Sequence, residues 1–287
     1  MGYAKTFYPG SKVTHYINTL ASKIYLGIYR NRKEESSRIV TFWKYDVPIT
    51  MYRHRKFIGF AFAIFFLFFS VGFFSSMHDD GFVREMLGDS YVNMTERNID
   101  QGNPFGVYGQ GNQFYMWIMI MLNNIFVSFR YFFLGIFLGI PSLTALARES
   151  VTLGAFEHMF YAHNLGAKAV VAMLIHGMLE LTAIILTCAA GVVMGTAWLF
   201  PGTIKRWDAF RRGTKDGIIM VVSLIPVFMT AAFFEGFITR YANEMPMALS
   251  ISLLLLSGLF IVWYYGIYPY RLHKKQKVLK SEVVLHA

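Results

Sequence analysis

The sequence predicts an all-α membrane protein, a polytopic helix bundle with five or six membrane-embedded segments. Two observations support this prediction. The composition is 55% hydrophobic and only 15% charged, whereas soluble domains typically carry about 25% charged residues. The apolar residues are also gathered into runs of the roughly 20 residues that a helix needs to cross about 30 Å of hydrocarbon. These runs are residues 57–76, 114–140, 169–200, 217–239 and 247–270.

The five runs are almost free of charge. The first and the last contain no charged residue, and the other three contain one Arg or Glu each, namely Arg130, Glu180 and Glu235. Runs of this length and purity are typical of transmembrane helices and not of the core helices of a soluble domain. We therefore expect lipid to surround most of the chain.

The charges between the runs predict the topology. Residues 1–56 hold 11 Lys and Arg against 3 Asp and Glu, residues 201–216 hold 5 against 2, and residues 271–287 hold 5 against 1. Residues 76–113 hold 2 against 6. Because Lys and Arg remain on the cytoplasmic side of membranes, both termini are predicted to be cytosolic.

This pattern also predicts the domain organisation. Residues 1–56 form a basic, amphipathic segment in the cytosol or at the interface, residues 57–270 form the transmembrane domain, and residues 271–287 form a basic cytosolic tail. The acidic loop at 76–113 lies on the extracytoplasmic side. The basic stretches flank spans, where anionic headgroups attract them, so the expected partner is the lipid bilayer and not a nucleic acid.

The predicted topology contains a parity conflict. If run 57–76 leads out and run 114–140 leads back, run 169–200 must both begin and end in the cytosol. Its length exceeds one crossing and falls short of two. A broken or re-entrant segment would resolve the conflict, as would a pair of short spans, or entry of the linker 141–168 into the membrane.

Polar side chains inside the runs are the candidate functional residues, because a polar group at bilayer depth requires a partner or a role. We expect them to form one buried intramembrane cluster, and its members are Asn123, Asn124, Arg130, His176, Gly177, Glu180, Glu235 and Gly236. His176 and Glu180 are four residues apart and share one helix face. The adjacent Asn123 and Asn124 point in different directions, so each is expected to bond a different neighbouring helix.

Two interpretations of this cluster stay open. In one, His176, Glu180 and Glu235 form a proton path, an ion site or a hydrolytic centre. In the other, a hydrogen-bonded knot fixes the helix packing, with Arg130 neutralising a carboxylate. A zinc enzyme needs at least three ligands, and the pair on one helix face supplies two. The sequence therefore predicts no metal, cofactor or catalytic residue, and the single Cys188 excludes an intrachain disulfide.

Two glycine pairs, Gly135 with Gly139 and Gly191 with Gly195, have the four-residue spacing that lets helices approach closely. Tight packing within the chain and formation of a homodimer both fit this spacing.

Several motifs carry a family resemblance. In chain order they are Leu122-Asn123-Asn124-Ile125, Phe133-Leu134-Gly135-Ile136-Phe137-Leu138-Gly139, Leu153-Gly154-Ala155-Phe156, His176-Gly177-Met178-Leu179-Glu180-Leu181, Gly191-Val192-Val193-Met194-Gly195, Phe200-Pro201-Gly202 and Glu235-Gly236-Phe237-Ile238-Thr239. Their order resembles that of the bacterial stage II sporulation protein M family, and the flanking pieces Thr41-Phe42-Trp43-Lys44 and Tyr91-Val92-Asn93-Met94 resemble its longer non-sporulation branch. Longer members usually carry more cytosolic helical sequence before the equivalent of Tyr3, so a docking piece is expected to be missing or truncated here.

The resemblance implies a multi-pass protein of the bacterial inner membrane. In spore formers, the family member is a scaffold that partners peptidoglycan-degrading enzymes. A scaffold or assembly factor for cell-envelope machinery, with envelope proteins as partners, is therefore the first hypothesis. An ion- or proton-coupled transporter or channel that uses His176, Glu180 and Glu235 is the second, and an intramembrane hydrolase is the third. A more distant similarity is to permease subunits of export-type ABC transporters.

Overall fold

The computed structural model describes residues 38–104, 106, 112–241 and 244–285, together with five isolated positions between 12 and 20. The chain divides into two units, residues 1–44 and 45–287, and each is described by itself. In the first unit, α3 spans Arg38–Thr41. Most of the amphipathic segment predicted within residues 1–56 falls outside the described residues.

The second unit is helical, and the described part of the chain contains no strand. Its elements, which follow the π-helical turn η1 (Phe42–Asp46), are α4 (Val47–Arg53), α5 (Arg55–His78), α6 (Asp80–Leu87), α7 (Asp89–Asp100), α8 (Gln113–Leu134), α9 (Ile140–Ala162), α10 (Gly166–Leu199), α11 (Arg206–Phe233), η3 (Phe234–Ile238), η4 (Thr239–Tyr241), α12 (Met247–Ile261), η5 (Val262–Ile267) and α13 (Tyr268–Leu285). This confirms the all-α prediction.

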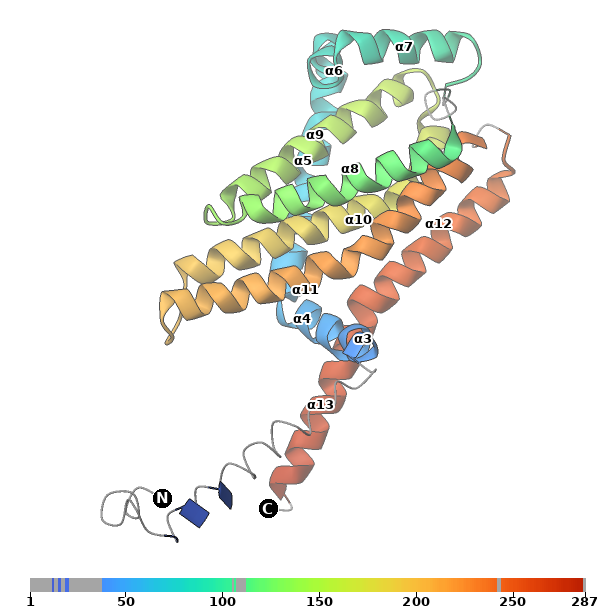
Figure 1. Ribbon diagram of the computed structural model, residues 1–287. Helices are drawn as coiled ribbons and strands as arrows, with labels where there is room; N and C mark the ends of the chain where they lie inside the picture. The colour runs from blue at the N-terminus through green and yellow to red at the C-terminus, as the bar shows by residue number, and fades with distance from the viewer. Residues whose placement is uncertain are drawn as a thin grey trace. The chain divides into compact units, whose positions relative to one another are not determined.

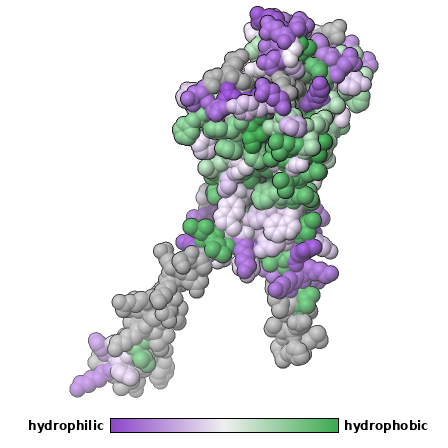
Figure 2. Space-filling model, turned by 90° about the vertical axis from the view of Figure 1, so that its right-hand side faces the viewer, coloured by the Kyte–Doolittle hydropathy of each residue, from purple (hydrophilic) through white to green (hydrophobic). Residues whose placement is uncertain are grey.

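Five helical stretches among the described residues are long and apolar enough to cross a membrane. They are α5, α8, α10, α11 with the two turns that follow it, and α12 with its continuation into α13. Figure 2 shows a hydrophobic band on the second unit between hydrophilic ends. The chain is therefore a polytopic membrane protein.

A sixth long helix, α9, lies beside α5 and α8 in the bundle (Figure 1). It packs along α5 and also contacts α10 and α8. Its 23 residues would span about 35 Å. The hydropathy pattern missed this helix because it carries Arg148, Glu149 and Glu157, and the last of these is buried.

The segment predicted to be broken or re-entrant is instead one continuous helix. α10 runs from Gly166 to Leu199 without interruption, so that expectation is wrong for residues 169–200. Of the alternatives, the structure agrees with the one in which the linker 141–168 joins the bundle. α10 lies at the centre of the fold, since it contacts α5, α8, α9, α11 and α12.

Glycines bring the helix backbones into direct contact. A Cβ at Gly135 would collide with the backbone of Gly191, and a Cβ at Gly195 would collide with the backbone of Gly139. Gly72 of α5 meets the backbone of α9 in the same way. The two glycine pairs therefore pack against each other within one chain, and they give no support to a homodimer, which stays a prediction.

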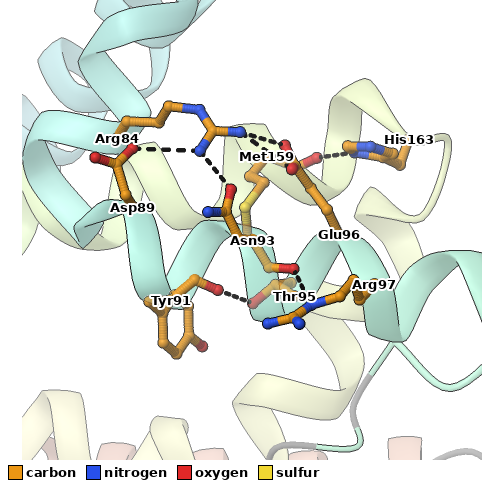
Figure 3. Close-up of polar contacts among 9 residues, drawn as sticks. All are labelled: Arg84, Asp89, Tyr91, Asn93, Thr95, Glu96, Arg97, Met159 and His163. Carbon is orange, nitrogen blue, oxygen red and sulfur yellow. Dashed lines mark hydrogen bonds and ion pairs between the residues drawn. The ribbon is translucent and has the colours of Figure 1, made fainter.

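The acidic connection between α5 and α8 contains two helices, α6 and α7, which we call the cap. Asp79 begins α6, because its Oδ1 accepts a hydrogen bond of 2.8 Å from the Gly81 N–H. Arg84 ties the two helices together, with bonds to Asn93 at 2.7 Å and to Glu96 at 3.1 Å (Figure 3).

The cap packs onto the transmembrane helices through an apolar underside. Val83 and Val92 are buried in one cluster with Met159 and Phe160 of α9 and Ala172 of α10. Ion pairs therefore hold the cap together on its outer side, and hydrophobic contacts hold it on the bundle.

Candidate functional site

A chamber of about 350 Å³ lies between α9, α10, η3 and the cap. Glu149, His176, Glu180 and Glu235 line it, and Tyr91 of the cap completes its wall. Residues that are far apart in the sequence thus surround one space. A volume of this size is typical of ligand-binding pockets.

His176 and Glu180 reach the chamber from α10, where their four-residue spacing places them on one face. Glu235 approaches from η3. The nearest ligand atoms of these three side chains all lie within 4.8 Å of one another. His176 is buried, and its Nδ1 is 3.0 Å from the Thr239 Oγ1. The structure therefore brings together the three ionisable residues that the sequence analysis grouped.

Glu235 belongs to a π-helical turn that follows α11 directly. Such turns add one residue to a helical turn, and they frequently mark functional sites. The turn continues into η4, which carries the buried Thr239 to His176. The local widening of the helix thus positions both the carboxylate and the hydrogen-bond partner of the imidazole.

The chamber has an excess of carboxylates. Glu149, Glu180 and Glu235 line it, and no Lys or Arg is among the described residues that do so. Arg130 was expected to neutralise a carboxylate in the cluster, but its side chain is exposed and does not line the chamber. That expectation is wrong, because Arg130 lies on an outward face of α8. Carboxylates in such a site need protons or a bound cation to offset their charge.

The two asparagines differ from the prediction. Asn124 is buried and approaches Glu180 from α8. Asn123 is exposed, and its Nδ2 donates a hydrogen bond of 3.4 Å to the Oδ1 of Asn124. The two residues therefore do not bond different neighbouring helices, because Asn123 turns back onto its own helix.

The two glycines of the predicted cluster have different surroundings. Gly177 lines the chamber beside His176. Gly236 is buried against the backbone of Trp117 on α8, where a Cβ would lie 3.4 Å from the Trp117 Cα. Gly236 therefore serves helix packing and not the chamber.

The sequence analysis missed Glu149, Thr239 and Tyr91. Glu149 lies in α9, which was treated as a linker, and its Oε2 accepts a hydrogen bond of 3.2 Å from the Tyr131 hydroxyl. Burial raises the pKa of Tyr91, and the nearby Glu235 carboxylate raises it further. In the sequence, Glu149 comes shortly before the Leu153-Gly154 motif, but nothing there indicated that α9 joins the bundle.

Comparison with known proteins agrees with the architecture. No curated protein and no solved structure matches the chain. The family model described as Stage II sporulation protein M matches residues 61–240, which include every helix that lines the chamber. This match covers more than half of the chain, so the protein belongs to the stage II sporulation protein M family.

Proposed function

We propose that this membrane protein binds a divalent metal cation in the chamber and transports it. The observation that carries the proposal is the composition of the chamber wall: three carboxylates and an imidazole, with no Lys or Arg among the described residues that line it. A self-satisfied structural knot would need basic partners or protons for these acids. A bound cation supplies the missing positive charge.

The ligand types favour a first-row transition metal. An imidazole suits Zn²⁺ and Fe²⁺, and carboxylates suit Mn²⁺ as well. Two ligands of one tetrahedral ion lie about 3.4 Å apart, and the atoms of His176, Glu180 and Glu235 lie within 4.8 Å of one another. Small side-chain rotations would close this difference. Three protein ligands would leave one position open for water or for exchange.

The proposed orientation follows from six crossings. If α9 crosses the membrane, the parity conflict disappears and the basic stretches 1–56, 201–216 and 271–287 all lie in the cytosol. The cap is then extracytoplasmic, and the chamber lies at that end of the bundle, beneath the cap. We therefore propose that the protein lies in the bacterial inner membrane with both termini in the cytosol.

Metal titration and flux together test the proposal. The full-length protein in lipid nanodiscs is titrated with ZnCl₂ and with MnCl₂ by calorimetry, and proteoliposomes with a trapped metal-sensitive dye report uptake. We expect one ion per chain for the wild type. Glu235→Gln should weaken binding by at least about tenfold and abolish uptake, since one of three ligands is lost.

Glu85→Gln is the matched control, because Glu85 is an exposed carboxylate of the cap that does not line the chamber. Equal binding by the wild type and Glu235→Gln, with both folded, would overturn the cation site. Metal binding without any uptake would overturn the transport function while leaving the binding site intact.

A scaffold for envelope machinery is the second candidate function. The rigid backbone contacts at Gly72, Gly135 and Gly195 favour it, since they oppose the rocking of helix pairs that transport requires. In that case the cation would stabilise one assembled form. Affinity purification from the envelope should then capture different partners with the wild type and with the cap variants Val83→Asp and Val92→Asp. The intramembrane hydrolase hypothesis stays an untested prediction.

A further inference from the structure

A second pocket lies at the other end of α10, away from the chamber. Its volume is about 620 Å³. Arg53, His54 and Phe57 enter it from the junction of α4 and α5, and Arg212 and Asp216 enter it from the first turns of α11. We call it the basic pocket.

The basic pocket carries an excess of positive charge. Asp216 is its one acidic residue among the described lining residues, and this carboxylate is already shared. Its Oδ2 lies 2.8 Å from the Arg53 Nη1 and 2.8 Å from the His54 Nε2. Arg212 is exposed and forms no ion pair within the described part of the chain. The guanidinium of Arg212 is thus available to an anionic ligand.

The remaining wall of the basic pocket is hydrocarbon. Phe57, Val193, Ala197, Phe200 and Ile204 contribute to it. A free phosphate would gain nothing from such a wall, whereas an acyl chain would bury apolar surface against it. The combination of guanidinium and hydrocarbon fits a ligand with an anionic head and an apolar tail.

Neighbouring side chains place this pocket at the depth of the lipid headgroups. Two aromatic residues at this end of the bundle are exposed, Phe200 to 73% and Trp207 to 57%. The Arg211 guanidinium lies over the Trp207 ring, 5.9 Å from its centroid. Exposed aromatic and basic residues together are typical of the membrane–water interface.

We infer that the basic pocket binds one anionic phospholipid, with its phosphate at Arg212 and Arg53 and one acyl chain along Phe57 and Val193. The lipid would fill the gap between the α4–α5 junction and the α10–α11 hairpin. The inference does not depend on the cation site, since none of the residues involved lines the chamber.

Native mass spectrometry of the delipidated full-length protein tests this inference. The probes are phosphatidylglycerol and phosphatidylcholine with identical acyl chains. We expect the wild type to retain one phosphatidylglycerol in preference to phosphatidylcholine. Arg212→Gln should reduce this preference by about fivefold, which corresponds to the loss of one basic contact.

Lys215→Gln is the matched control. It removes one positive charge from the same part of α11, but Lys215 does not line the pocket. An equal loss in both variants would mean diffuse surface attraction and would overturn the inference. Ile204→Trp, in the loop before α11, should fill the apolar half and expel the lipid without changing charge. Displacement of the lipid by millimolar inorganic phosphate would overturn the assignment to a phospholipid.

Discussion

The chamber and the basic pocket lie along the same helix and have opposite chemistry. α10 contributes His176 and Glu180 to the chamber and Val193 and Thr196 to the basic pocket. The 17 residues from His176 to Val193 correspond to about 25 Å of helix. The chamber collects carboxylates without a basic partner among its described lining residues, whereas the basic pocket contains two arginines and one acid, Asp216, which Arg53 and His54 already share.

The difference follows from the surroundings of each site. The acids of the chamber come from the interior of the bundle, where water does not screen them and an unpaired charge is costly. The arginines of the basic pocket lie near helix ends, which the proposed topology puts among headgroups and water. The proposed cation would offset the charge of the chamber acids, whereas the proposed lipid would bind to a pocket whose own acid is already paired.

Disrupting the close helix packing that supports both sites should have the largest effect. Gly195→Val would drive a side chain into the backbone at Gly139, which cannot move aside as a side chain can. We expect a destabilisation of about 3 kcal/mol or more and the loss of both sites. Thermal unfolding of the detergent-solubilised protein measures this. Gly59→Val is the control, since nothing lies within 4 Å of a Cβ at Gly59.

Removing one acid from the chamber should change metal binding there without changing lipid binding in the basic pocket. Glu180→Gln keeps the size of the side chain and removes one ligand, so we expect a 10- to 100-fold loss of metal affinity, about 1.4–2.7 kcal/mol. Phosphatidylglycerol retention should not change. Calorimetry and native mass spectrometry on the same preparation report both quantities. If fold, metal affinity and assembly all stayed intact, the polar cluster would not be the key element of the molecule.

Removing the acid of the basic pocket should give the opposite pattern. Asp216→Asn removes the negative charge that Arg53 and His54 share. Because the Arg53 side chain is 57% exposed, solvent screening limits the loss to about 1 kcal/mol. The pocket becomes more positive, so phosphatidylglycerol should bind more tightly. Weaker lipid binding by a folded Asp216→Asn protein would contradict the proposed lipid site.

The cap should show the smallest effect. The raised pKa of Tyr91 means that the folded protein retains this proton above pH 10, while the unfolded chain loses it. The wild type should therefore lose stability as the pH rises above 10, and Tyr91→Phe should lose less. Denaturant unfolding at pH 9 and pH 10.5 compares the two. An identical pH dependence in both proteins would show that Tyr91 is not held away from water.

Much of the fold followed from the sequence, because long uncharged runs have low free energy in the hydrocarbon of a membrane. The runs at 57–76, 114–140, 217–239 and 247–270 all correspond to helices of the bundle. α9 could not be predicted in this way. Its two acids face inward, since Glu149 lines the chamber and Glu157 is buried, and hydropathy measures composition without knowing which face is buried.

The candidate site was predicted in part. The four-residue spacing of His176 and Glu180 fixed their common face, since helical periodicity is a local property. Whether Arg130 or Glu149 would join them depended on how α8 and α9 are rotated, which is a matter of packing. Arg130 turned outward and Glu149 inward, and this exchange changed the expected charge of the cluster from nearly balanced to acidic.

The sequence by itself determined that the chain lies in a membrane, which segments are helical and where its basic stretches occur, because these depend on local composition and spacing. Only the tertiary structure decided that α9 completes the bundle, that the glycine pairs pack within one chain and that acids from three elements surround one chamber. Those features depend on the rotation and contact of helices far apart in the chain, and no local pattern encodes them.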